Sequence, residues 1–213
     1  MSQPTTRGVL WSPIAILWMA AAFPADDSGA LDARLNQAMR RSFAAATPAE
    51  WKTRLEQDQS QASCSRYRNA PPPEVAAAIS AEARSSVRYP PSGKLLGDWR
   101  KGEQIASISG GGQLSTITPD PAGPKRGGNC FACHVLSSSE VAAGNLGPVL
   151  TGYAKVRGTS EESVRYTYEK VYNAQAYFAC SFMPRFGHNG WLTPEQVADV
   201  VAFLLDPQSP VNR

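Results

Sequence analysis

Histidine is scarce in this sequence of 213 residues: it occurs twice, as His134 and His188, beside four cysteines. A structural zinc site needs four ligands, which come mostly from cysteine and histidine at short, regular spacings. Two of the four cysteines, Cys64 and Cys180, stand alone in the sequence. The sequence therefore argues against a structural zinc site.

A strong excess of charge of one sign is also missing. The chain has 21 lysines and arginines against 18 aspartates and glutamates, a formal net charge of +3, and neither half is polarised. Surfaces that bind nucleic acid or anionic membranes usually carry clustered basic residues. We expect no nucleic-acid partner.

Long hydrophobic runs are limited to one stretch, residues 9–23, which follows Arg7 and ends in small residues. This pattern is typical of a secretory signal, and cleavage after Ala22 or Ala25 fits the small-residue rule. The alternative is an uncleaved membrane anchor, for which the run is short of the roughly 20 apolar residues needed. We predict that residues 1–25 are a signal peptide and that the protein is periplasmic, without a stable membrane anchor.

The sequence Cys130-Phe131-Ala132-Cys133-His134 is a C-x-x-C-H motif, the pattern of c-type haem attachment. Two thiols can bond both vinyl groups of one porphyrin, and the following imidazole can reach the iron. A thioredoxin-type redox motif would instead follow a β-strand, whereas residues 127–129 are Gly-Gly-Asn. We predict one covalent haem c at Cys130 and Cys133, with His134 as the proximal iron ligand.

No alternating β pattern is evident, so the predicted fold class is all-α. The clearest helix begins at Thr193, which can cap it with Pro194 in the first position and Gln196 closing a capping box. Further helices are expected from Leu31, from Thr47 to near Cys64, over residues 74–86, after an N-cap at Asp98, and over residues 160–175.

The predicted domains are a helical N-terminal extension, residues 26–93, and a haem domain, residues 94–213. The extension is too polar and too rich in alanine to form a large core of its own. We expect it to pack on the haem domain or on a partner subunit.

A second axial ligand is sought on the iron face opposite His134. Beyond the predicted signal peptide, the methionines are Met39 and Met183. Met183 precedes a proline in a polar loop, where a core methionine has no periodic reason to occur, and it is the predicted ligand. Its alternative role is a gap-filling core thioether, and His188 and Cys180 remain rival ligands.

Cys64 and Cys180 lie outside the haem motif. In an exported protein, two such cysteines most simply form a disulfide, which would join the extension to the loop that carries Met183. The alternative is a redox-active thiol close to the haem.

Four motifs together resemble class I cytochromes c, and more closely the SoxX family, the monohaem subunit of the SoxXA sulfur-oxidation cytochrome. The resemblance covers about residues 94–207 and rests on Cys130–His134, Gly147-Pro148-x-Leu-x-Gly152, Met183-Pro184-x-Phe-Gly187 and Leu192-Thr193-Pro194-Glu195-Gln196-x-x-Asp199. It implies a class I cytochrome c fold with His134 and Met183 as axial ligands. It also implies that the carbonyl of Pro148 accepts the Nδ1 proton of His134.

The resemblance further implies an electron-transfer subunit of an L-cysteine S-thiosulfotransferase complex. A SoxA-like dihaem or monohaem cytochrome would form a heterodimer with this chain and join thiosulfate to the carrier cysteine of SoxYZ. This chain would pass the released electrons to a soluble cytochrome c. The alternatives are an independent electron shuttle, the haem subunit of another dehydrogenase, and a disulfide-stapled binding module without haem.

Overall fold

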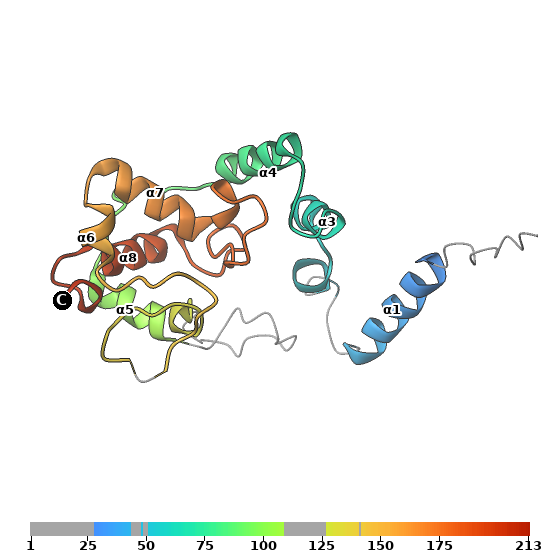
Figure 1. The fold of residues 1–213 in the computed structure, drawn as a ribbon, viewed down its shortest axis with the longest axis horizontal. Helices are drawn as coiled ribbons and strands as arrows, with labels where there is room; N and C mark the ends of the chain where they lie inside the picture. The colour runs from blue at the N-terminus through green and yellow to red at the C-terminus, as the bar shows by residue number, and fades with distance from the viewer. Residues whose placement is uncertain (1–27, 44–47, 49–50, 109–126, 141) are drawn as a thin grey trace, which may run out of the picture. The chain divides into compact units, whose positions relative to one another are not determined.

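The computed structural model describes residues 28–43, 48, 51–108, 127–140 and 142–213. Over these residues the secondary structure is helical and contains no strand, which confirms the all-α prediction. The predicted signal peptide and the predicted start of a helix at Thr47 lie outside the described residues. In chain order the elements are α1 (Ser28–Ser42), the π-helical turn η1 (Trp51–Leu55), α3 (Gln59–Arg66), α4 (Pro73–Ser85), α5 (Trp99–Ser107), η2 (Cys130–Ala132), α6 (Tyr153–Arg157), α7 (Glu161–Tyr172), η3 (Ala174–Ala176), α8 (Pro194–Leu205) and η4 (Pro210–Asn212) (Figure 1).

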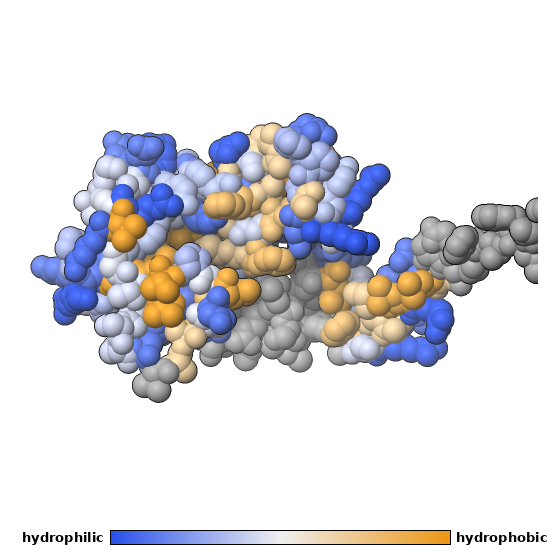
Figure 2. Space-filling model, in the orientation of Figure 1, coloured by the Kyte–Doolittle hydropathy of each residue, from blue (hydrophilic) through white to orange (hydrophobic). Residues whose placement is uncertain are grey.

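The chain divides into two compact units, residues 1–44 and 45–213. The described part of the first unit is α1, whose apolar side chains are exposed, 65% for Leu31 and 55% for Leu35. Figure 2 shows hydrophobic surface on the face of α1 that it draws. The boundary that we predict between the extension and the haem domain, at residue 93, stays a prediction.

Helix α8 forms the centre of the second unit. Thr193 accepts a hydrogen bond from the backbone N–H of Gln196, whose side chain bonds back to the N–H of Thr193, so the predicted capping box is present. Burial then extends along almost the whole helix, including Val197, Val201 and Phe203, which are at most 1% exposed. Helices α5 and α7 pack against it.

Helix α5 packs against α8 (Figure 1). The two helices approach each other very closely at Gly102. A Cβ atom at this position would come within 3.0 Å of the backbone of Asp199 and of the Cβ of Phe203. The preceding segment is bonded to α8 as well, because the N–H of Asp98 donates to the carboxylate of Asp199 at 2.8 Å. Asp98 also caps α5, as predicted, by accepting from the N–H of Arg100.

The prediction of one continuous helix from Thr47 to near Cys64 is wrong. The structure has the turn η1 followed by a break, and α3 begins anew at Gln59. Asp58 causes this restart: its carboxylate accepts from the N–H of Gln61 at 2.8 Å, while the Gln61 side chain accepts from the N–H of Asp58 at 3.0 Å. Such a reciprocal pair stabilises a helix N-terminus.

Helix α4 matches the helix predicted over residues 74–86. It packs against η3, and its Arg84 guanidinium donates to the carbonyl of Ala176 at 2.6 Å. The extension therefore packs, through this helix, on the part of the chain that follows α7. No helix in the described part of the chain combines the length and the apolarity that crossing a bilayer requires.

Candidate functional site

The C-x-x-C-H sequence forms a tight 3-10 turn, η2. The N–H groups of Cys133 and His134 both donate to the carbonyl of Cys130, at 3.1 and 2.9 Å. Asn129, just before the turn, has the left-handed backbone angle φ of 44°. This local geometry brings the two thiols and the imidazole onto one short segment.

A second segment, residues 144–150, runs beside this turn. Backbone hydrogen bonds of 2.8–2.9 Å join the two, from Gly144 to Phe131, from Gly147 to Cys133 and from Leu150 to Val135. These hydrogen bonds place residues 147 and 148 beside His134. Glycine is required at 144, because a Cβ there would overlap the backbone of Ala132.

His134 is held in one orientation by this second segment. Its Nδ1 lies 2.8 Å from the carbonyl oxygen of Pro148, the contact that the resemblance implied. Gly147 passes so close to the ring that a Cβ there would lie within 3.0 Å of three ring atoms. Because a carbonyl can only accept, Nδ1 must carry the proton, which leaves the lone pair of the neutral ring on Nε2. That nitrogen is free to bind a metal.

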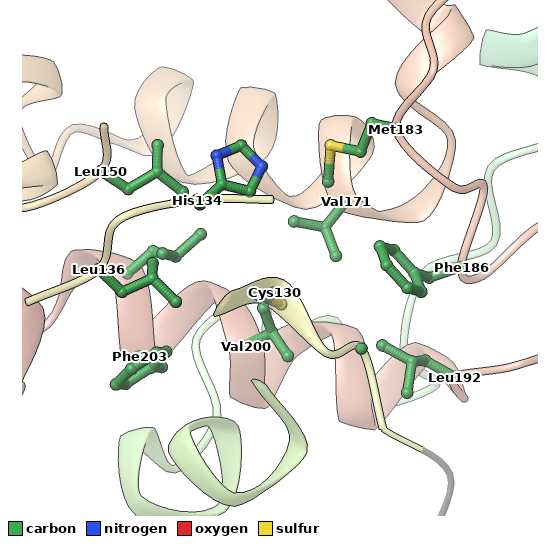
Figure 3. A pocket seen from close by; sticks show the side chains of 12 residues that line it. Cys130, His134, Leu136, Leu150, Val171, Met183, Phe186, Leu192, Val200 and Phe203 are labelled. Carbon is green, nitrogen blue, oxygen red and sulfur yellow. The ribbon is translucent and has the colours of Figure 1, made fainter. Parts of the chain in front are cut away.

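Both thiols and the imidazole line a cavity of about 840 Å³. A smaller, almost entirely apolar cavity (Figure 3) shares Cys130, His134 and Met183 with it and is lined by Gly128, Cys130, His134, Leu136, Leu150, Val171, Met183, Phe186, Leu192, Val200, Phe203 and Leu204. Cofactor sites typically occupy about 300–1,000 Å³ and have mostly apolar walls with a few polar groups. The cavity has the size and the lining of a cofactor site.

Met183 reaches the same cavity from the loop between η3 and α8. In Figure 3 its thioether and the imidazole of His134 lie at the same pocket, with Val171 near both. The rival His188 is exposed and lies outside the cavity lining, with its Nδ1 3.2 Å from the hydroxyl of Ser86. The second rival, Cys180, lines the cavity but is already bonded to another cysteine.

That partner is Cys64, so the predicted disulfide is present, with a Cα–Cα distance of 5.6 Å. It belongs to a small apolar cluster with Ile79 and Ala179, apart from the main core. Cys130 and Cys133 are free. Burial, together with the neighbouring Cys133, raises the pKa of the Cys130 thiol to about 12. Such a thiol is unlike the reactive cysteine of a thioredoxin-type motif, whose pKa is lowered.

Two basic residues of the cavity wall were not singled out from the sequence, Arg157 and Lys170. Each lies over an aromatic ring: Arg157 is 4.2 Å from the centre of Tyr166, and Lys170 is 4.0 Å from that of Phe178. Burial, helped by the charge of Arg157, lowers the pKa of Lys170 to about 8. No motif marks these residues in the sequence.

The turn between α3 and α4 also contributes to the cavity wall, through Asn69, Ala70 and Pro71, and α4 contributes Ala76. We predicted that the extension would pack on the haem domain or on a partner, and this turn packs at the candidate site itself. Nothing in the sequence pointed to it, because long-range packing of a short polar turn leaves no periodic signal.

Comparison with known proteins adds two findings. A family model for cytochrome c matches residues 122–207. A protein of Aquifex aeolicus (strain VF5), described as an uncharacterized lipoprotein, is 40% identical over 158 residues, which cover 74% of this chain and 73% of the relative. This chain belongs to the same family. Its C-terminal part is a cytochrome c domain, and there Cys130 and Cys133 are available as a C-x-x-C haem site.

The features of this cytochrome c domain fit haem c. The cavity offers free thiols at the spacing of the motif, an imidazole with an available Nε2 and mostly apolar walls. The matched segment contains η2, α6, α7, η3 and α8. The comparisons establish a cytochrome c domain. They do not extend to the closer resemblance to SoxX.

Proposed function

We propose that this chain is an electron carrier located outside the cytoplasm, with one haem c bonded to Cys130 and Cys133 and axially ligated by His134 and Met183. The observation that carries the proposal is that these four side chains line one apolar cavity of a cytochrome c domain. Bound haem would supply a one-electron Fe(II)/Fe(III) couple, and the protein sets its environment.

The chain's own residues would tune that couple in three ways. Pro148 and Gly147 hold the His134 ring in one orientation, and a bond from Nδ1 to a carbonyl raises the basicity of Nε2. A methionine partner raises the reduction potential relative to two histidines. Arg157 and Lys170 place positive charge at the cavity wall, where it can offset the haem carboxylates. With His134 and Met183 both bound to it, the iron would have no open position for a substrate.

The location outside the cytoplasm is supported by the disulfide between Cys64 and Cys180, since such bonds persist in oxidising compartments. The Aquifex relative is described as a lipoprotein, which is consistent with export. The signal peptide that we predict at residues 1–25 supports the same location.

The test is an absorption spectrum of the oxidised protein, expressed with export and haem-attachment machinery. We expect haem to stay with the denatured chain, and we expect the weak far-red charge-transfer band that marks methionine sulfur on Fe(III). Met183→Ala should lose the band, while the matched control His188→Ala should keep it. A chain that carries no covalent haem would refute the proposal, and a band that persists in Met183→Ala would refute the ligand assignment.

A place in a SoxXA complex is a second candidate. It rests on the motif resemblance to SoxX and on the exposed apolar residues of α1, Leu31 and Leu35, which suit a permanent partner better than a free shuttle. The chain would then accept electrons while a SoxA-like subunit couples thiosulfate to SoxYZ. Co-purification with a second cytochrome favours this role, whereas a monomeric haem protein that reduces a soluble cytochrome c favours an independent shuttle.

A further inference from the structure

The loop that carries Met183 has little regular structure of its own. Between η3, which ends at Ala176, and α8, which begins at Pro194, the chain forms turns and bends. The N–H of Met183 donates to the hydroxyl of Ser181 at 3.2 Å, a strictly local contact. Irregular surface segments are the more mobile parts of a fold. The position of the thioether must therefore depend on contacts from elsewhere in the chain.

Two cross-links supply such contacts, one on each side of Met183. Cys180, three residues earlier, is bonded to Cys64. Arg185, two residues later, pairs with Asp58, with the guanidinium nitrogen and the carboxylate oxygen 2.6 Å apart. The Arg185 side chain is 11% exposed and that of Asp58 42%, so the pair is shielded from water on the arginine side.

Both partners of these cross-links belong to the same helix. Asp58 is the N-cap of α3, and Cys64 lies in its body near the C-terminal end. The carboxylate of Asp58 thus has two roles: one oxygen accepts from the N–H of Gln61, and the other pairs with Arg185. Residues 180–185 are tied at both ends to one short, capped helix.

Helix α3 is itself supported by α4, which holds the rest of the same loop. Arg84 donates to the carbonyl of Ala176, and the hydroxyl of Ser86 lies 3.2 Å from both the Asn173 amide and Nδ1 of His188. An apolar cluster joins α3, through Cys64, to α4, through Ile79. These contacts anchor the segments that precede and follow the cross-linked part of the loop.

We propose that α3 is a clamp that positions Met183 as an axial ligand, through the disulfide from Cys64 and the ion pair from Asp58. The proposal rests on the proposed function, because it presupposes that Met183 binds the haem iron. The clamp residues precede residue 122, where the match to the cytochrome c family begins. The N-terminal extension thus supplies the two residues, Asp58 and Cys64, that restrain the Met183 loop from outside the matched domain.

The test measures how easily an external ligand displaces Met183. Oxidised holoprotein is titrated with imidazole, and loss of the far-red methionine band is followed, for the parent, Asp58→Asn, and Cys64→Ser with Cys180→Ser. Asparagine is also a good N-cap, so Asp58→Asn removes the charge that faces Arg185 while keeping α3 capped. The control, Glu161→Gln, removes the exposed ion pair with Arg165 on α7.

We expect imidazole to bind about twofold to fivefold more tightly to Asp58→Asn, the effect of losing one ion pair. We expect roughly tenfold or more for the double cysteine variant, where a covalent restraint is removed. Glu161→Gln should match the parent. Hydrogen exchange of residues 177–190, which needs no haem signal, should be faster in both clamp variants and unchanged in the control.

Two results would overturn the clamp, and they are distinguishable. If both clamp variants bind imidazole like the parent and exchange at the parent's rate, α3 does not position Met183, although the proposed function stands. If the parent shows no methionine band at all, the ligand assignment fails and the clamp fails with it.

Discussion

Replacing Gly102 by alanine should destabilise the protein, even though alanine is the better helix former. In an exposed helix interior the change would stabilise by about 1 kcal/mol. At Gly102, however, the new Cβ would come within 3.0 Å of the α8 backbone at Asp199 and of the Cβ of Phe203, which is 1% exposed. None of these atoms ends a flexible side chain, so α5 and α8 must move apart.

Overpacking of this kind costs about 1–3 kcal/mol, and contact with backbone argues for the upper end. After subtraction of the helix-propensity gain, the free energy of unfolding should fall by about 2 kcal/mol. For a chain of this size the midpoint of thermal unfolding should then drop by about 4–8 °C. Far-UV circular dichroism during guanidinium and thermal unfolding measures both quantities.

Lys101→Ala is the matched control, because Lys101 is exposed on the same helix. Surface substitutions of this kind change stability by about 0.5 kcal/mol or less. If Gly102→Ala were as stable as the parent or more stable, the close approach of α5 and α8 would not limit this position, and the reasoning would be refuted.

Three further predictions concern single contacts. Thr193→Ala should lower the free energy of unfolding by about 1 kcal/mol in chemical denaturation, since it removes the cap of α8, whereas Thr193→Ser should not. Burial alone would raise the pKa of the Asp58 carboxyl. The hydrogen bond from the N–H of Gln61 and the charge of Arg185 nevertheless hold that pKa below its usual value. The stabilising contribution of Asp58 is therefore present above about pH 4 and lost as the pH falls through the folded-state pKa. In Asp58→Asn the free energy of unfolding should depend less on pH in this acidic range. Gly147→Ala should push the His134 ring off its carbonyl partner, so that its Nδ1 proton exchanges faster with water in nitrogen-edited NMR spectra.

Each of these has a contrary outcome. Equal stability of the alanine and serine variants at position 193 would mean that the hydroxyl does not cap the helix. If the stability of Asp58→Asn depended on acidic pH as strongly as that of the parent, other carboxylates would dominate this pH dependence. If the Nδ1 proton of His134 exchanged at an unchanged rate in Gly147→Ala, residues 144–150 would be able to move away without breaking the hydrogen bond to the imidazole.

The elements with strong local signals were predictable from the sequence. The capping box at Thr193 fixes where α8 begins, and the cap at Asp98 does the same for α5. The C-x-x-C-H motif located the site, because its chemistry is contained in five consecutive residues. The break before α3 had a local signal too, the reciprocal pair of Asp58 and Gln61, which was masked by the helical spacing around it.

The remaining parts of the site could not be predicted because they depend on long-range packing. Arg157 and Lys170 reach the cavity only through the placement of α6 and α7. Pro71 and its neighbours reach it because α4 packs on η3, more than 90 positions later in the chain. The ion pair of Asp58 with Arg185 is of the same kind: each residue is unremarkable in its own surroundings, and only the fold joins them.

The raised pKa of Cys130 has a consequence for thiol exchange during maturation. Four cysteines can pair in three ways, and Cys130 lines the same cavity as the disulfide sulfur of Cys180. Exchange requires a thiolate as the attacking group, but with a pKa of about 12 the Cys130 thiol stays protonated at neutral pH. Once the chain has folded, attack by Cys130 on the bond between Cys64 and Cys180 is therefore slow. Oxidised and reduced pairs can coexist in one small domain.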